Sequence, residues 1–115
     1  MRRDAALALA ASAPVFAALG DEQRLRLVTR LCNDGPLSIA RLTEGTNVSR
    51  QAVTKHLRVL EGAGLARGER SGRETVWTLE PRPLAKARDH LALISRQWDD
   101  AIERLRAFVE ADDEG

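Results

Sequence analysis

Residues 49–60 combine side-chain types and a spacing that suit contact with DNA. At 100° per residue, Val53, Leu57 and Leu60 fall on one side of a helix. The opposite side carries no carboxylate and presents Gln51, Thr54, Lys55 and Arg58, with Arg50 in the first turn. Arginine and lysine pair with phosphates and guanine, and glutamine pairs with adenine. The pattern therefore indicates a helix that lies in a major groove. The alternative is an ordinary amphipathic helix with a solvated basic face.

The elements around this helix are expected to form a helix-turn-helix. Ser38 is placed to cap a short helix over residues 39–44, and Ser49 to cap the basic helix, because a serine hydroxyl accepts from a first-turn N–H. Residues 45–48 connect the two, and Gly64 ends the second helix so that Leu65 returns to the core. Two short helices joined by a tight turn are typical of this motif. Free N–H groups at both helix starts would also suit phosphate.

A β-hairpin, or wing, is predicted next. Residues 66–70 and 73–79 are extended runs on either side of Ser71 and Gly72, and the second run is rich in strand-forming residues. Arg70 and Arg73 lie near its tip, where arginines enter a minor groove or pair with phosphates. The alternative is that these arginines only keep an exposed sheet edge soluble.

Two shorter helices are expected before this motif. Residues 1–12 are predicted to be a flexible N-terminal extension, and Pro14 is placed to open a helix that ends at residue 19. Asp21 would cap a second helix that runs to about residue 32. The inward side of that second helix is expected to carry Leu25, Val28 and Leu31, which are spaced by three.

A long final helix is predicted over residues 84–110, with apolar residues every seven positions for more than three repeats. Such a helix spans about 40 Å, which exceeds what a small domain needs for its own core. Much of the stripe is therefore expected to pack on a second copy of the chain, unless it folds entirely onto its own domain. The acidic residues 111–115 are expected to be disordered. The predicted dimer interface comprises Val15, Phe16, Leu19, Leu91, Ile94, Trp98, Ile102 and Leu105.

Length and composition favour one domain, placed at residues 13–110, that combines DNA binding and dimerisation. The chain has 115 residues and a formal net charge of +1, but residues 50–75 hold six cations against three acids, whereas residues 82–115 hold six against eight. A basic middle fits a molecule that offers one face to DNA. The single cysteine excludes an intrachain disulfide, and no apolar run suits a membrane span or a signal sequence, so a cytoplasmic location is expected.

An enzyme is not expected. The chain has two histidines, one cysteine and no tyrosine, and it lacks a glycine-rich phosphate loop and a nucleophile elbow. No cofactor is therefore predicted, and the sequence indicates no particular small-molecule effector. A winged-helix module that binds proteins without specific DNA binding is a second alternative, because fold alone does not settle function. The basic face without carboxylates argues against that alternative.

The order of elements and two stretches of sequence resemble the ArsR/SmtB family of bacterial winged-helix repressors. The matching stretches are FAALGDEQRLRL at 16–27 and SRQAVTKHLRVL at 49–60, followed by AGL at 63–65 and GR at 72–73. The resemblance covers roughly residues 13–110 and implies a homodimer that occupies an inverted-repeat operator. Asn47 stands where glycine is usual and Thr54 where serine is usual. Asparagine tolerates a left-handed backbone and threonine keeps the hydroxyl, so DNA binding is still expected.

Metal sensing is the property of this family that the sequence does not support. Many relatives bind metal through a Cys-x-Cys pair near the helix before the recognition helix, or through Asp, His and Glu on the last helix. Residues 37–44 contain no cysteine, and Asp89 and His90 are adjacent with no second histidine following. We expect Cys32 to be a buried small hydrophobe, His56 to bond locally or to phosphate, and His90 to lie alone on the surface. A metal- or thiol-responsive repressor remains the alternative.

Overall fold

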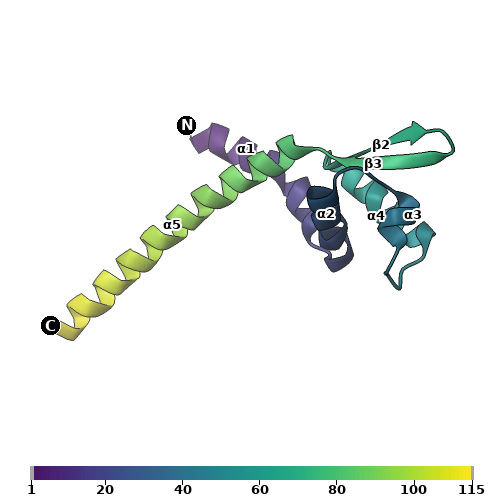
Figure 1. Ribbon diagram of the computed structural model, residues 1–115. Helices are drawn as coiled ribbons and strands as arrows, with labels where there is room; N and C mark the ends of the chain where they lie inside the picture. The colour runs from purple at the N-terminus through teal and green to yellow at the C-terminus, as the bar shows by residue number, and fades with distance from the viewer. Residues whose placement is uncertain (1, 115) are drawn as a thin grey trace.

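The computed structural model describes the backbone of residues 2–114 and the side chains of residues 10–111. Over these residues a small head of helices and strands is joined to one long projecting helix (Figure 1), and the extents are 73 × 33 × 20 Å. The expected fold class is confirmed: mainly α with a small β-hairpin, in a winged helix-turn-helix with a long C-terminal helix. The elements in order are α1 (Arg2–Leu19), α2 (Glu22–Asp34), β1 (Leu37–Ser38), α3 (Ile39–Thr43), α4 (Arg50–Gly62), β2 (Ala66–Ser71), β3 (Glu74–Leu79) and α5 (Pro81–Glu114).

The helix starts follow from local capping chemistry. The carboxylate of Asp21 accepts from the backbone N–H of Arg24 at 3.0 Å, which starts α2. Ser38 caps α3 and Ser49 caps α4 in the same way, each by accepting a backbone N–H at 3.2 Å. All three predicted caps are confirmed. The end of α4 is also as expected, because Gly64 takes a positive φ of 77° and the chain turns back there.

The core lies where α2, α4 and the sheet meet. Helix α4 buries Val53, Leu57 and Leu60, as its periodicity predicts. Leu65 and Trp77 have no exposed surface, and they close the core from the wing side. The wing is therefore packed onto α4 through large apolar side chains.

The sheet has three antiparallel strands in the order β1-β3-β2. The hairpin of β2 and β3 is the predicted wing, paired from Ala66 with Leu79 to Ser71 with Glu74, and Gly72 takes a φ of 65° in its turn. Strand β1 was not predicted. It is only two residues long, pairs with β3 through Leu37 and Trp77, and carries too short a pattern to be recognised in sequence.

Two predicted helix boundaries are wrong. Helix α1 begins at Arg2, and Pro14 lies inside it rather than at its start. The alanine-rich residues before Pro14 form helix readily, so the helix tolerates the one backbone hydrogen bond that the proline cannot make. Helix α5 runs from Pro81 to Glu114, which is longer than predicted. The domain boundaries and the disorder of 111–115 stay predictions, and residues 1 and 115 lie outside the described residues.

The inward face of α2 was also predicted incorrectly. The buried residues are Leu27, Val28 and Leu31, while Leu25 keeps 48% of its surface exposed. Cys32 is exposed and does not act as a buried small hydrophobe. Leu25 and Cys32 lie about a quarter to a third of a turn from the centre of the buried face, because each residue advances by about 100°. None of the described helices is long and apolar enough to cross a membrane.

Candidate nucleic-acid interface

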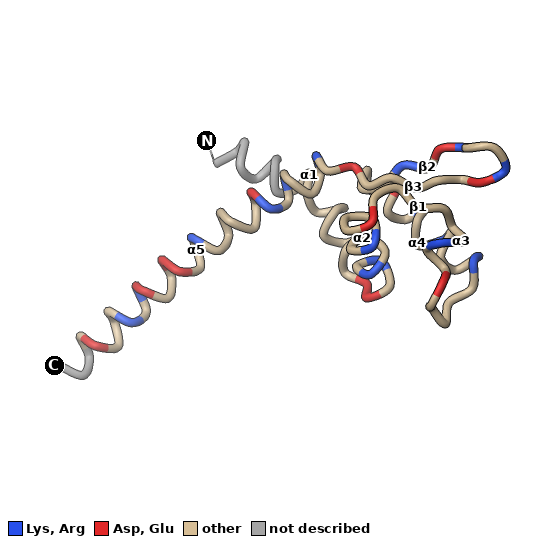
Figure 2. The backbone as a smooth tube through the Cα atoms, viewed as in Figure 1, with Lys and Arg blue, Asp and Glu red and all other residues tan. Residues whose placement is uncertain are grey.

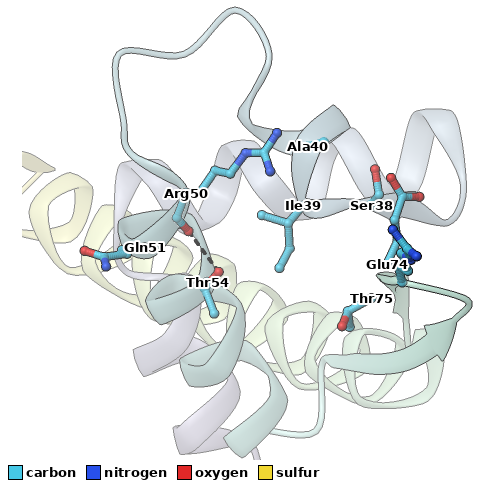
Figure 3. A pocket seen from close by; sticks show the side chains of 9 residues that line it. Ser38, Ile39, Ala40, Arg50, Gln51, Thr54, Glu74 and Thr75 are labelled. Carbon is cyan, nitrogen blue, oxygen red and sulfur yellow. Dashed lines mark hydrogen bonds between the residues drawn. The ribbon is translucent and has the colours of Figure 1, made fainter.

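Two consecutive helices and the hairpin, which is distant from them in sequence, meet around a hollow of about 450 Å³. Helix α4 forms one side, the start of α3 the second, and the hairpin of β2 and β3 the third (Figure 3). Five residues that are predicted to contact DNA line this hollow. They are Ser38, Arg50, Gln51, Thr54 and Arg73.

Side chains on α4 divide between the hollow and the outside. The Arg50 side chain extends across the hollow toward the start of α3, whereas the amide of Gln51 is directed away from it (Figure 3). The hydroxyl of Thr54 donates to the carbonyl of Arg50 at 2.8 Å. Because its proton is used within the helix, the Thr54 side chain offers a partner only an oxygen acceptor and a methyl group. The first two turns of α4 therefore direct a cation into the hollow and an amide out of it, with the small amphipathic side chain of Thr54 beside the hollow.

Some of the basic side chains on α4 and on the hairpin of β2 and β3 are paired with carboxylates, and others are not. Arg50, Lys55, Arg70 and Arg73 are exposed and have no carboxylate within 4 Å among the described side chains. In Figure 2 basic segments lie at the tip of the wing and beside α3 and α4, with acidic segments between them on the wing. A surface cation without an internal partner remains available for an external anion such as phosphate.

Arg58 differs from these four cations. Its guanidinium pairs with Glu61 at 2.9 Å and lies over the Trp77 ring at 5.3 Å from the ring centroid. A guanidinium over an indole face is a favourable cation–π contact. The structure thus directs Arg58 from α4 toward the wing. Arg67 on β2 is also neutralised, by Glu69 at 3.0 Å and Glu80 at 2.9 Å.

His56 lies apart from the hollow. It is partly buried, and its Nδ1 accepts a hydrogen bond from the Arg24 guanidinium at 3.4 Å and lies 3.9 Å from the Asp21 carboxylate. The Arg24 side chain also donates to the carbonyl of Ala18 at 2.6 Å. The Arg24 backbone N–H is the main reason why the pKa of Asp21 lies below its ordinary value. Of the two roles predicted for His56, the structure therefore shows the local contacts, which link α4 to the start of α2.

Gly68 and Trp77 are structural residues of the wing whose role was not predicted from the sequence. They face one another across β2 and β3. A Cβ atom at Gly68 would lie 3.1 Å from the Trp77 ring, so any larger residue would require the indole to shift by a few tenths of an ångström. A glycine inside a strand pattern indicates such a close approach, and that signal was present in the sequence.

Known proteins match this chain over most of its length. Residues 19–69 match a family model described as a helix-turn-helix domain. The chain is 35% identical over 95 residues to the HTH-type transcriptional regulator Rv2034 of Mycobacterium tuberculosis. The match covers 83% of this chain and 85% of that protein. The chain belongs to the ArsR/SmtB family of transcriptional regulators.

Other ArsR/SmtB-family proteins agree with this assignment. The ArsR-like transcriptional regulator from Rhodococcus sp. RHA1 superposes with a TM-score of 0.71 at 34% identity, and the match covers 87% of this chain and 93% of that one. The HTH-type transcriptional regulator NmtR of M. tuberculosis is 38% identical over 82 residues, which are 71% of this chain and 68% of that protein. These relatives are transcriptional regulators and not enzymes.

The apolar stripe of this ArsR/SmtB-family chain is exposed on the distal part of α5. Five predicted interface residues there, Leu91, Ile94, Trp98, Ile102 and Leu105, are exposed, and Trp98 keeps 67% of its surface. The predicted interface residues on α1 differ. Val15 is only 5% exposed and belongs to the core of its own chain, and Phe16 and Leu19 pack partly against that core. The three α1 residues are therefore at least partly used within one protomer.

The side chains that could ligate a metal are not clustered in the part of this chain that the structure describes. No three of the His, Cys, Asp and Glu side chains that the structure describes are close enough to hold a metal ion. Cys32 is exposed on α2, and His56 lies beside Asp21 and Arg24. His90 does not stand alone on the surface as predicted, because its Nδ1 lies 2.6 Å from the hydroxyl oxygen of Ser12 on α1.

Proposed function

We propose that the protein is a homodimeric, sequence-specific DNA-binding repressor that occupies an inverted-repeat operator, including one upstream of its own gene. The observation that supports this best is the hollow between α4, α3 and β3. The unneutralised cations Arg50 and Arg73 line this hollow, and Gln51, which also borders it, directs its amide outward. Cations bind the DNA backbone of any sequence, and an amide distinguishes adenine from other bases. Their combination on one face is what sequence-specific binding requires.

Each part of the interface has a separate role in this proposal. Gln51, Thr54 and Lys55 contact base edges in the major groove, with Arg50 at the first turn. Arg70 and Arg73 contact the flanking backbone or the minor groove, as wing arginines do. Arg58 contacts Glu61 and Trp77, so it would contact DNA from the side of α4 nearest the wing. Ser38 and Ser49 place backbone N–H groups near phosphate.

Dimerisation is proposed from the stripe on α5. A large exposed apolar face is costly in water, and a second copy of the same stripe would cover it. Two recognition helices related by two-fold symmetry would then contact half-sites roughly 34–36 Å apart. The same proposal places the protein in the cytoplasm, where a bacterial chromosome lies.

Independence from metal is part of the proposal, since the described histidines and the cysteine lie on different elements. The test is DNA affinity with a chelator and with added zinc. Equal affinity under both conditions is expected. A change in affinity would instead support the metal-responsive alternative, with Cys32, His56 and His90 as the ligands to substitute first.

DNA binding itself is tested by fluorescence anisotropy, with a labelled duplex from the gene's own upstream region and a shuffled duplex at two salt concentrations. Gln51→Ala is expected to lose roughly 1–3 kcal/mol of discrimination between the duplexes, because it removes a base contact. Arg73→Ala is expected to weaken both duplexes alike and to lower the salt slope by about 1, because it removes a phosphate contact. Arg96→Ala, an exposed cation on α5, is the matched control and should change neither.

Two outcomes would contradict the proposal. Equal losses on both duplexes for Gln51→Ala and Arg73→Ala would refute the division between base and phosphate contacts. Wild-type protein that shows no preference for the upstream duplex, and no loss on charge reversal of Lys55 and Arg58, would favour the protein-interaction module.

A further inference from the structure

A second hollow, of about 430 Å³, lies between α1 and the first turns of α5. Helices α1 and α5 cross and contact one another there (Figure 1), on a different part of the molecule from the hollow between α4 and the wing. The proposed DNA contacts do not use any of its lining residues. Its volume falls in the range of pockets that bind small molecules, roughly 300–1,000 Å³.

The polar side of this hollow is basic. Arg82, Lys86 and His90 are spaced by four residues on α5, so they lie along one face of the helix. No acidic side chain is among the lining residues that the structure describes. Arg82 and Lys86 also lack a carboxylate within 4 Å in the described part of the chain, whereas Arg88 on the same helix lies 3.5 Å from Asp89.

The hydroxyl of Ser12 orients the third basic side chain. Ser12 is only 4% exposed, and its oxygen lies 2.6 Å from Nδ1 of His90. When the hydroxyl donates this hydrogen bond, the neutral imidazole carries its proton on Nε2. That N–H is then a donor for a ligand in the hollow. A hydrogen bond between a buried hydroxyl on one helix and a partly buried imidazole on another also helps to hold the ring in one position.

The remaining walls are apolar. Val15 on α1, Pro83 on α5 and Ala63 at the end of α4 provide them. The hollow also lies at the N-terminal end of α5, where the helix dipole favours an anion. An inorganic anion would make no contact with the apolar walls, and a neutral apolar molecule would leave the cations unpaired.

We propose that this hollow is a binding site for a small organic oxyanion, a carboxylate or a phosphate monoester attached to a compact apolar group. Lys86 and Arg82 pair with the oxyanion, Nε2 of His90 donates to it, and Val15, Pro83 and Ala63 contact the apolar group. This site goes beyond the proposed DNA-binding function, and its binding measurement does not depend on that function. Because Ala63 directly follows α4, a bound ligand also contacts the end of the recognition helix.

Isothermal titration of the full-length protein tests the site with four probes: benzoate, phenyl phosphate, benzamide and inorganic phosphate. Benzoate or phenyl phosphate is expected to bind, and the tighter of the two identifies the acid class. Benzamide has the same shape as benzoate without its charge, and inorganic phosphate has charge without an apolar group. Both are expected to bind at least tenfold more weakly than the better probe, a difference of about 1.4 kcal/mol.

Three variants locate the binding. Lys86→Gln is expected to weaken the better probe about tenfold, because it removes a charge-assisted hydrogen bond. Ser12→Ala, which keeps a small buried side chain, should also weaken it because the imidazole loses its orienting contact. Arg88→Gln removes the same charge from α5 outside the hollow and should leave the affinity within about twofold of wild type, well below the tenfold loss. The proposal is overturned if none of the probes binds, if benzamide equals benzoate, or if Arg88→Gln loses as much as Lys86→Gln.

A second readout separates this inference from the proposed function. Anisotropy with the upstream duplex, repeated with saturating probe, measures whether occupancy of the hollow changes DNA affinity. The titration alone decides whether the site exists, and failure of DNA binding leaves that result intact.

Discussion

Replacing Gly68 with alanine would show how firmly the wing is held against the recognition helix. Gly68 on β2 pairs with Trp77 on β3, and an added Cβ would lie 3.1 Å from Cζ2 of the indole and 3.2 Å from Cγ2 of Thr75. Trp77 has no exposed surface, so its ring cannot move into solvent and any displacement must disturb the residues packed around it. The substitution is therefore an overpacking change rather than a change in backbone strain.

The expected cost is about 1–3 kcal/mol in the free energy of unfolding, as for other groups forced into a well-packed core. For a domain of this size, each kcal/mol lowers Tm by roughly 4–8 °C. The Arg58 guanidinium also lies over the same ring, so a displaced indole shifts the contact between α4 and the wing. Weaker binding to the upstream duplex is expected along with the loss of stability.

Gly62 provides the matched control. It is the last residue of α4, its φ is not positive, and an added Cβ would meet nothing within 4 Å. Because alanine forms helix more readily than glycine, Gly62→Ala is expected to stabilise by up to about 1 kcal/mol. Urea unfolding at matched protomer concentration measures both variants, since the stability of an oligomer depends on its concentration. A Gly68→Ala protein within about 0.5 kcal/mol of wild type, the range of ordinary surface changes, would refute the packing argument.

Three further predictions concern α4, α5 and α2. Ser49→Ala removes the cap of α4 and should cost about 1 kcal/mol in urea unfolding, whereas Ser49→Gly should cost only a few tenths. Trp98→Glu places a charge in the proposed dimer interface and should convert dimer to monomer in sedimentation, while the neighbouring control Gln97→Glu keeps the dimer; a dimeric Trp98→Glu protein would place the interface elsewhere. The pKa of Asp21 is lowered in the folded state, chiefly by the Arg24 N–H, so its contribution to stability is present above the ordinary value of 3.8 and is lost as pH falls through the folded value. Asp21→Asn keeps a capping side chain and should flatten the stability profile below about pH 5, and an unchanged acid profile would show that this carboxylate is not responsible.

The sequence predicted best those features that depend on neighbouring residues. The caps at Asp21, Ser38 and Ser49 each join a side chain to a backbone N–H three residues later, so the pattern is complete within one turn. The inward face of α4 and the turn at Gly72 are local in the same sense. These features are enough to fix the helix-turn-helix and the wing, and therefore most of the candidate DNA interface.

Features that depend on distant residues could not be predicted. Arg58 shows the same basic character as Lys55 in sequence, and only the folded chain reveals that Trp77 lies beneath it. His90 and Ser12 are 78 residues apart, and their contact exists only because α1 and α5 cross. On α2, a spacing of three fits Leu25 as well as Leu31. Only the contacts with other elements of the fold determine that Leu31 is buried and Leu25 is exposed.

The connection between the wing and α5 links the two halves of the proposed function. Glu80 alone separates β3 from α5, and its N–H donates to the carbonyl of Leu65 at 2.8 Å while its carboxylate pairs with Arg67 at 2.9 Å. Pro81 then fixes the backbone φ where α5 begins. Because Leu65 follows the end of α4, this short connection links α5, the wing and α4. In the proposed dimer, a change in how two α5 helices pack would therefore be transmitted to both α4 helices, and we expect the packing of α5 to set the spacing of the half-sites.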